Sequence, residues 1–79
     1  MMARLLLFGP AREAAGVSSV TLPGHDVAGI IGAAEQRFGE TFVRILATSS
    51  VWLNGDAVDM DAAVSDNDEV AVIPPVSGG

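Results

Sequence analysis

The chain has 79 residues, enough for one small domain, and we expect residues 1–79 to form it with 74–79 as a projecting carboxyl-terminal tail. A net charge of −6 and the absence of Lys leave no basic surface for nucleic acid, and they disfavour an anionic membrane. The absence of Cys excludes disulfides and cysteine metal sites, and it fits the reducing cytoplasm, where we expect the protein to act. The negative charge is compatible with a basic protein partner.

Two short apolar segments near the amino terminus predict the first pair of strands. Residues 4–8 form an apolar run ended by a Gly-Pro pair, which is typical of a buried strand. One or two helical turns over 11–15, closed by Gly16, lead to a second strand over 17–22, where apolar and polar side chains come to alternate. The short separation favours an antiparallel hairpin with a widened connection.

The clearest helix is predicted over residues 27–38. Asp26 is a favourable N-cap and Gly39 is the expected stop. Gly29 and Gly32 lie inside, where each costs about 0.5–1 kcal/mol relative to Ala, and a close approach of the helix to a sheet would explain them. The apolar side chains form one stripe with helical spacing: Val27, Ile30, Ile31, Ala34 and Phe38.

The second half of the chain predicts a hairpin and a final strand. Residues 40–50 are apolar without a clear period, so a short helix and an irregular connection both stay open. Asn54-Gly55 divides the apolar stretch 51–58 and indicates a hairpin, because both central residues of a type I′ turn need positive φ. After a polar loop, residues 69–73 are nearly all apolar, which predicts a central strand covered on at least one face.

This order of elements predicts an α+β fold: a β-grasp with a mixed sheet packed on one main helix. The first strand would lie parallel to the last in the centre of the sheet. One face of so thin a sheet can stay open, and an apolar open face would be a docking surface. Phe8 and Trp52 suit either the core or such a surface, and we predict that Trp52 is in the core because large aromatic side chains tend to bury.

The side chains show no recognisable metal or nucleotide site. His25 is the only histidine, is expected to be exposed, and has no Cys or second His with which to share a metal. The acidic residues Asp66, Asp68 and Glu69 lack the glycine and terminal Glu of a calcium loop, so we interpret them as a turn before the last strand.

The ending Pro-Pro-Val-Ser-Gly-Gly is the remaining candidate for chemistry. Pro74-Pro75 favours a stiff extended exit, with a reach of roughly 15 Å. Gly78 and Gly79 carry no side chains, so they suit a narrow channel. The Gly79 carboxylate could attack the α-phosphate of ATP to form an acyl-adenylate, and a sulfur nucleophile could then displace AMP and leave a thiocarboxylate. The alternative is an inert tail.

Three segments resemble the molybdopterin synthase sulfur carrier (small) subunits, a MoaD/ThiS-like ubiquitin-fold family. Residues 7–16 resemble its first strand and Arg-Glu-x-x-Gly helix, and residues 51–56 resemble its strand and Asn-Gly turn. Residues 67–79 resemble its Gly-Asp-Glu-Val-Ala…Pro-Pro-Val-Ser-Gly-Gly ending, with Asn67 where Gly is usual. The resemblance covers almost the whole chain, and the ending is its most specific part.

The resemblance implies a ubiquitin-like β-grasp and a carrier cycle. An E1-like enzyme would use ATP to adenylate Gly79, and a sulfur donor protein would supply the sulfur of a thiocarboxylate. The tail would then enter the large catalytic subunit of molybdopterin synthase and convert cyclic pyranopterin monophosphate to molybdopterin. The chain itself would bind no cofactor or metal, and it would form a hetero-tetramer with the large subunit.

The resemblance also assigns site residues. It places the reaction at Gly79 and Gly78, and it leaves the roles of Arg12 and Glu13 open. The implied partner interface comprises Phe8, Ile73, Pro74, Pro75, Val76 and Ser77. Three alternatives remain: a carrier for thiazole synthesis or another thiolation pathway, a ubiquitin-like protein modifier, and an interaction domain with an inert tail.

Overall fold

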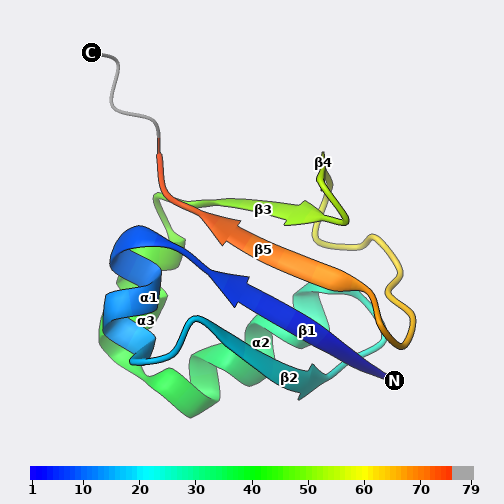
Figure 1. Ribbon diagram of the computed structural model, residues 1–79, viewed down its shortest axis with the longest axis horizontal. Helices are drawn as coiled ribbons and strands as arrows, with labels where there is room; N and C mark the ends of the chain where they lie inside the picture. The colour runs from blue at the N-terminus through cyan, green and yellow to red at the C-terminus, as the bar shows by residue number, and fades with distance from the viewer. Residues whose placement is uncertain (76–79) are drawn as a thin grey trace.

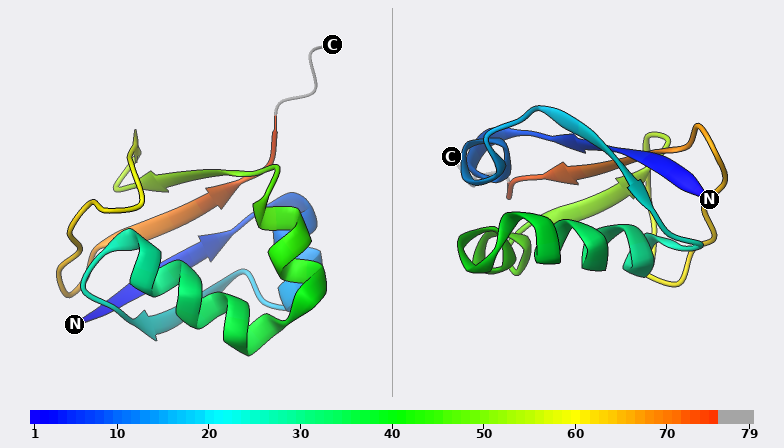
Figure 2. Two further views of the ribbon diagram at one scale, coloured as in Figure 1. Left: turned by 180° about the vertical axis from the view of Figure 1, so that it is seen from behind. Right: turned by 90° about the horizontal axis from the view of Figure 1, so that it is seen from below.

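The computed structural model describes residues 1–75, which form a five-stranded mixed sheet with helices packed on one face (Figures 1 and 2). The strand order is β2-β1-β5-β3-β4, with β1 and β5 parallel at the centre and the other pairs antiparallel. The elements are β1 (Met2–Leu7), α1 (Gly9–Ala15), β2 (Ser19–Pro23), α2 (Val27–Phe38), α3 (Glu40–Leu46), β3 (Ser50–Leu53), β4 (Asp56–Ala57) and β5 (Glu69–Ile73).

This arrangement confirms the predicted α+β β-grasp and the parallel pairing of the first and last strands. The α2 helix is the one main helix that was predicted, and the shorter α1 and α3 helices pack beside the sheet and contact each other (Figure 2). The first strand also ends earlier than predicted. Phe8 is the extended residue that precedes α1, and it lies outside β1.

The α2 helix begins and ends where the sequence indicated. The Asp26 carboxylate accepts a 2.8 Å hydrogen bond from the Gly29 amide, as an N-cap does. Gly39 ends α2 with a φ of 89°, and α3 begins at the next residue. Of residues 40–50, for which two alternatives were open, 40–46 are helical and 47–49 form the connection to β3. At this corner the Phe38 and Phe42 rings pack with centroids 5.1 Å apart, and Phe42 is fully buried.

The explanation predicted for the two internal glycines was wrong. A Cβ at Gly32 would meet nothing within 4 Å, so no close approach requires that glycine. A Cβ at Gly29 would lie 3.3 Å from the Gly24 Cα, and a Cβ at Gly24 would lie 2.7 Å from the Ile30 amide nitrogen. The close approach therefore joins α2 to the turn after β2, and the sheet is not involved.

The core lies between the sheet and the helices, because each central strand turns alternate side chains toward them. The buried side chains of the strands are Ala3, Leu5, Leu7, Leu22, Val70 and Val72, and those of the helices are Ala11, Val27, Ile30, Ile31, Ala34 and Phe42. Among the described helices, none is long and apolar enough to cross a membrane.

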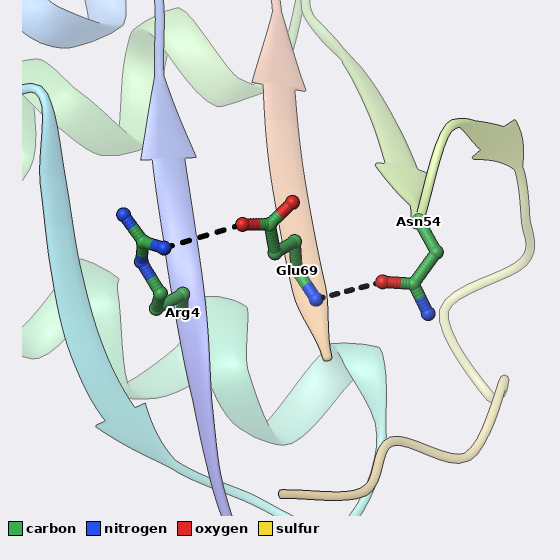
Figure 3. Close-up of polar contacts among 3 residues, drawn as sticks. All are labelled: Arg4, Asn54 and Glu69. Atoms are coloured by element: carbon green, nitrogen blue, oxygen red, sulfur yellow. Dashed lines mark hydrogen bonds and ion pairs between the residues drawn. The ribbon is translucent and has the colours of Figure 1, made fainter. Parts of the chain in front are cut away.

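Asn54 ties the hairpin turn to the start of β5 (Figure 3). Asn54 and Gly55 have φ values of 51° and 89°, which agrees with the predicted Asn-Gly turn. The Asn54 side chain accepts a 2.9 Å hydrogen bond from the Glu69 amide and donates one of 3.1 Å to the Asp68 carboxylate. One side chain thus holds β5 against the β3–β4 turn.

Replacing Asn54 with Gly tests this connection, because Gly tolerates the positive φ and removes both side-chain hydrogen bonds. We expect the free energy of unfolding, measured by urea denaturation, to fall by about 1–2 kcal/mol. Asn67→Gly is the matched control, since Asn67 has a φ of 73° and its side chain makes no hydrogen bond to the described residues. Equal losses in the two variants would contradict the role of the Asn54 side chain.

Candidate functional site

The sheet face opposite the helices carries a continuous apolar row. The strand register places Leu6 of β1 beside Ala71 of β5, and Ala71 beside Trp52 of β3. All three are partly exposed, and no described helix covers this open face (Figure 2). The prediction that Trp52 is in the core was wrong: its neighbours Val51 and Leu53 pack against the core, so the pleat turns Trp52 to the other side.

The apolar row is extended at the end of the sheet where β1 and β5 both finish. Leu7 pairs with Val72 at the end of the parallel strands. The next residues, Phe8 after β1 and Ile73 at the end of β5, therefore lie side by side on the open face. Phe8 is 46% exposed and Ile73 is partly exposed. Pro74 and Pro75 follow directly, so the apolar surface reaches the point where the chain leaves the sheet.

The other end of the open face is polar (Figure 3). Arg4 and Glu69 form an ion pair of 3.3 Å across the central strands, with both side chains about half exposed. A surface pair of this kind contributes little to stability. The pKa of Asp68 is lowered because its carboxylate accepts hydrogen bonds from the Ser65 amide and from the Asn54 side chain. The open face is thus divided into a charged half and an apolar half beside Pro74.

Pro74 packs against the backbone of Gly9, a contact that was not predicted from the sequence. Gly9 has a φ of +54°, and a Cβ built on it would lie 3.2 Å from the Pro74 Cγ and 3.6 Å from its Cβ. That distance is too short for a relaxed contact, so the proline ring rests on the bare Gly9 backbone. We call Phe8, Gly9, Ile73, Pro74 and Pro75 the tail root. The Gly-Pro step after the first strand was interpreted only as a strand end.

The structure brings part of the predicted site together. Phe8, Ile73, Pro74 and Pro75 are adjacent at the tail root, and their role in a partner interface stays a prediction. Residues 76–79, which carry the predicted Val76 and Ser77 contacts and the Gly78-Gly79 reaction site, lie outside the described residues.

Arg12 and Glu13 lie on the exposed side of α1, where they line a shallow depression with Gly16 and Ser18. The Gly16 amide donates a 2.9 Å hydrogen bond to the Arg12 carbonyl, and Gly16 ends α1 with a φ of 77°. The presence of glycine at the end of the Arg-Glu-x-x-Gly motif therefore has a structural explanation, because Gly16 adopts the left-handed conformation that ends α1. Neither charged side chain forms an ion pair within residues 1–75.

In the described part of the chain, no three His, Asp or Glu side chains lie close enough together to hold a metal ion. His25 is exposed, as expected, and its carbonyl accepts a hydrogen bond from the Val64 amide. The tail root and the apolar half of the open face are therefore the candidate site, and they offer a surface for a macromolecule in place of a pocket for a small one.

Comparison with known proteins gives consistent findings. Residues 5–79 match the model of the ThiS family. The molybdopterin synthase sulfur carrier subunit of Phaeosphaeria nodorum is 32% identical, over 95% of this chain and 88% of that protein.

Two solved structures are similar over the full length of both chains. The crystal structure of SAMP1 from Haloferax volcanii is 26% identical with a TM-score of 0.87. A chain from the complex of subunits 1 and 2 of the molybdopterin-converting factor of Helicobacter pylori is also 26% identical, with a TM-score of 0.76.

The contact between Gly9 and Pro74 is tested by comparing Gly9→Ala with Gly16→Ala. Both positions have positive φ, so each variant should lose about 1 kcal/mol or somewhat more from backbone strain. Only Gly9→Ala also forces a side chain against Pro74, since a Cβ at Gly16 would meet nothing within 4 Å. We expect an additional loss of about 1–3 kcal/mol in the free energy of unfolding, measured by urea denaturation.

Pro74→Ala supplies the rescue, because it removes the Cγ that a Cβ on Gly9 would meet. In the double variant the additional loss should disappear while the backbone strain remains. Equal losses for Gly9→Ala and Gly16→Ala, or an additional loss that Pro74→Ala leaves unchanged, would show that the contact does not constrain the tail root.

Proposed function

The chain belongs to the ThiS family, and we propose that it is the sulfur carrier subunit of a molybdopterin synthase. The observation that carries the proposal is the match of residues 5–79 to this family. It agrees with the 32% identity to a molybdopterin synthase sulfur carrier subunit. The geometry supports it, because the apolar half of the open face meets the tail root at the point where the chain leaves the sheet.

Gly79 is the proposed reactive residue. Its carboxylate attacks the α-phosphate of ATP on an E1-like enzyme, releasing pyrophosphate and forming an acyl-adenylate. Hydrosulfide, or an equivalent from a sulfur donor protein, then attacks the acyl carbon and displaces AMP to give the thiocarboxylate. The thiocarboxylate sulfur passes to cyclic pyranopterin monophosphate, and water returns the carboxylate. ATP is bound by the activating partner, and this chain needs no cofactor of its own for these steps.

The proposed partner at the open face is the large catalytic subunit. The similar Helicobacter pylori chain is found in a complex of subunits 1 and 2 of a molybdopterin-converting factor. Phe8, Ile73 and Trp52 would be covered by that subunit, since exposed apolar surface of this kind is typical of docking sites. We further propose that the assembly is a hetero-tetramer and that it acts in the cytoplasm.

Protein modification is the second candidate function. It is favoured by the similarity over the full chain to SAMP1, whose name stands for small archaeal modifier protein 1. It uses the same activated Gly79, with the amine of a partner lysine in place of sulfur as the nucleophile. Because the chain contains no Lys, it could be joined to other proteins but could not form lysine-linked chains with itself. A sulfur carrier for thiazole synthesis or another thiolation pathway differs from the first proposal only in the final acceptor.

Removing Gly79 tests the reactive residue. The full chain and the chain ending at Gly78 are incubated with an E1-like enzyme, ATP and sulfide, and intact mass is measured. We expect one oxygen to be replaced by sulfur at Gly79 in the full chain and no replacement in the truncated one, with unchanged thermal unfolding. Sulfur transfer by the truncated chain would rule out Gly79 as the carrier group.

The acceptor is identified by a second stage of the same experiment. The thiocarboxylated chain is mixed with the large subunit and the pterin precursor, and molybdopterin is the expected product. Transfer only to a lysine of another protein, detected as an isopeptide, would favour the modifier function.

Phe8→Asp tests the docking surface. A carboxylate at this 46% exposed position should leave the fold intact, because the wild-type side chain contributes little to the core. It should weaken binding to the large subunit by about tenfold or more in calorimetry, as expected for an apolar anchor. Val17→Asp is the control, since Val17 is 40% exposed and lies outside the tail root. Equal affinities for Phe8→Asp and the wild type would remove Phe8 from the interface.

A further inference from the structure

A second apolar surface lies on the helix side of the molecule, away from the open face. It is a shallow groove between α2 and α3, here called the α2–α3 groove, and Val51 of β3 also lines it. Its walls include Ala28, Ile31 and Glu35 of α2, Val43 and Ala47 of α3, and Met60 of the connection before β5. Val43 is 39% exposed and Met60 is 45% exposed, so two large apolar side chains flank the groove and face solvent.

Backbone hydrogen bonds hold the groove in shape. The Ala28 amide donates to the Met60 carbonyl at 2.8 Å, and the Val27 amide donates to the Ala62 carbonyl at 2.9 Å. These bonds fix the Met60 segment to the first turn of α2, while the packed rings at the α2–α3 corner fix the other wall. A preformed groove loses little conformational freedom when it is occupied, which favours binding.

The charges around the groove are acidic. Glu35 lines it, and Met60 stands between Asp59 and Asp61. The cation beside Val43, Arg44, is paired with Glu40 at 3.1 Å, and no Arg or Lys lines the groove. The groove therefore complements a cationic occupant and repels an anionic one, including an acidic membrane surface or a nucleic acid.

We propose that the α2–α3 groove binds a basic amphipathic segment of a partner protein. One or two large apolar side chains of that segment enter between Val43 and Met60, and flanking Lys or Arg side chains pair with Glu35, Asp59 and Asp61. A second copy of this chain fits less well, because each copy carries a net charge of −6.

This site is separate from the proposed carrier interface. Val51 and Trp52 are consecutive residues of one strand, so they face opposite sides of the sheet, Val51 toward the groove and Trp52 toward the open face. A segment in the groove and a partner on the open face therefore do not compete for the same surface. The groove can hold one partner while the tail is presented to another.

The test uses the full isotope-labelled chain and a synthetic helical peptide with Leu on one face and Lys on the other. We expect saturable amide shifts centred on Ala28, Val43, Ala47 and Met60, and an affinity that falls as salt is raised. Val43→Ser removes the apolar contact without adding a charge and should weaken binding by about tenfold or more, and Glu35→Gln should weaken it several-fold. Val17→Ser is the matched control, since Val17 is also an exposed valine (40%) and lies outside the groove, and it should bind as the wild type does.

Four results would overturn the proposal. These are shifts centred on the open face, equal binding of a peptide with Glu in place of Lys, no saturable shift at millimolar peptide, and a peptide-independent dimer that Val43→Ser disperses. Thermal unfolding of each variant checks that a lost interaction is not a lost fold. None of these readouts involves sulfur transfer, so the groove and the carrier function can fail independently.

Discussion

The parallel pairing of β1 with β5 is the constraint on which the rest of the molecule depends. It joins the two ends of the sequence at the centre of the sheet and makes both strands finish at the same edge. Phe8 and Gly9 are thereby placed beside Ile73 and Pro74, although about 65 residues separate them along the chain. A one-residue shift of this register would turn Val70 and Val72 out of the core. The burial of these side chains therefore also fixes where the tail root lies.

The two-residue period of the strands lets a very small protein carry a core and an exposed apolar surface in the same segments. Leu5, Leu7, Val70 and Val72 are almost completely buried, and the residues between them form the open face. The cost is that apolar side chains stay exposed in a chain with a modest core. Six of the ten acidic residues lie between Asp56 and Glu69, away from the tail root, so they add surface charge without charging the apolar half of the open face.

Local signals in the sequence predicted the local structure well. The Asp26 cap, the Gly39 stop and the Asn54-Gly55 turn each depend on a few neighbouring residues, so their chemistry is visible in sequence. Trp52 was misplaced because composition and hydrophobicity do not say which face of a strand a residue joins; that depends on its partners in the sheet. The Gly9–Pro74 contact was missed for the same reason, since it exists only after two distant segments have paired.

Surface area limits how such a carrier can work with several partners. A standard protein interface covers about 800 Å² on each partner, roughly a sixth of the 4660 Å² accessible surface of this chain. In the proposed cycle the activating enzyme and the large subunit would both need the tail, so they would bind this end of the molecule in turn. A partner that needs to stay bound through that exchange must hold a different face. The α2–α3 groove meets this requirement by geometry, because Val51 lines it while Trp52 lies on the opposite side of the sheet.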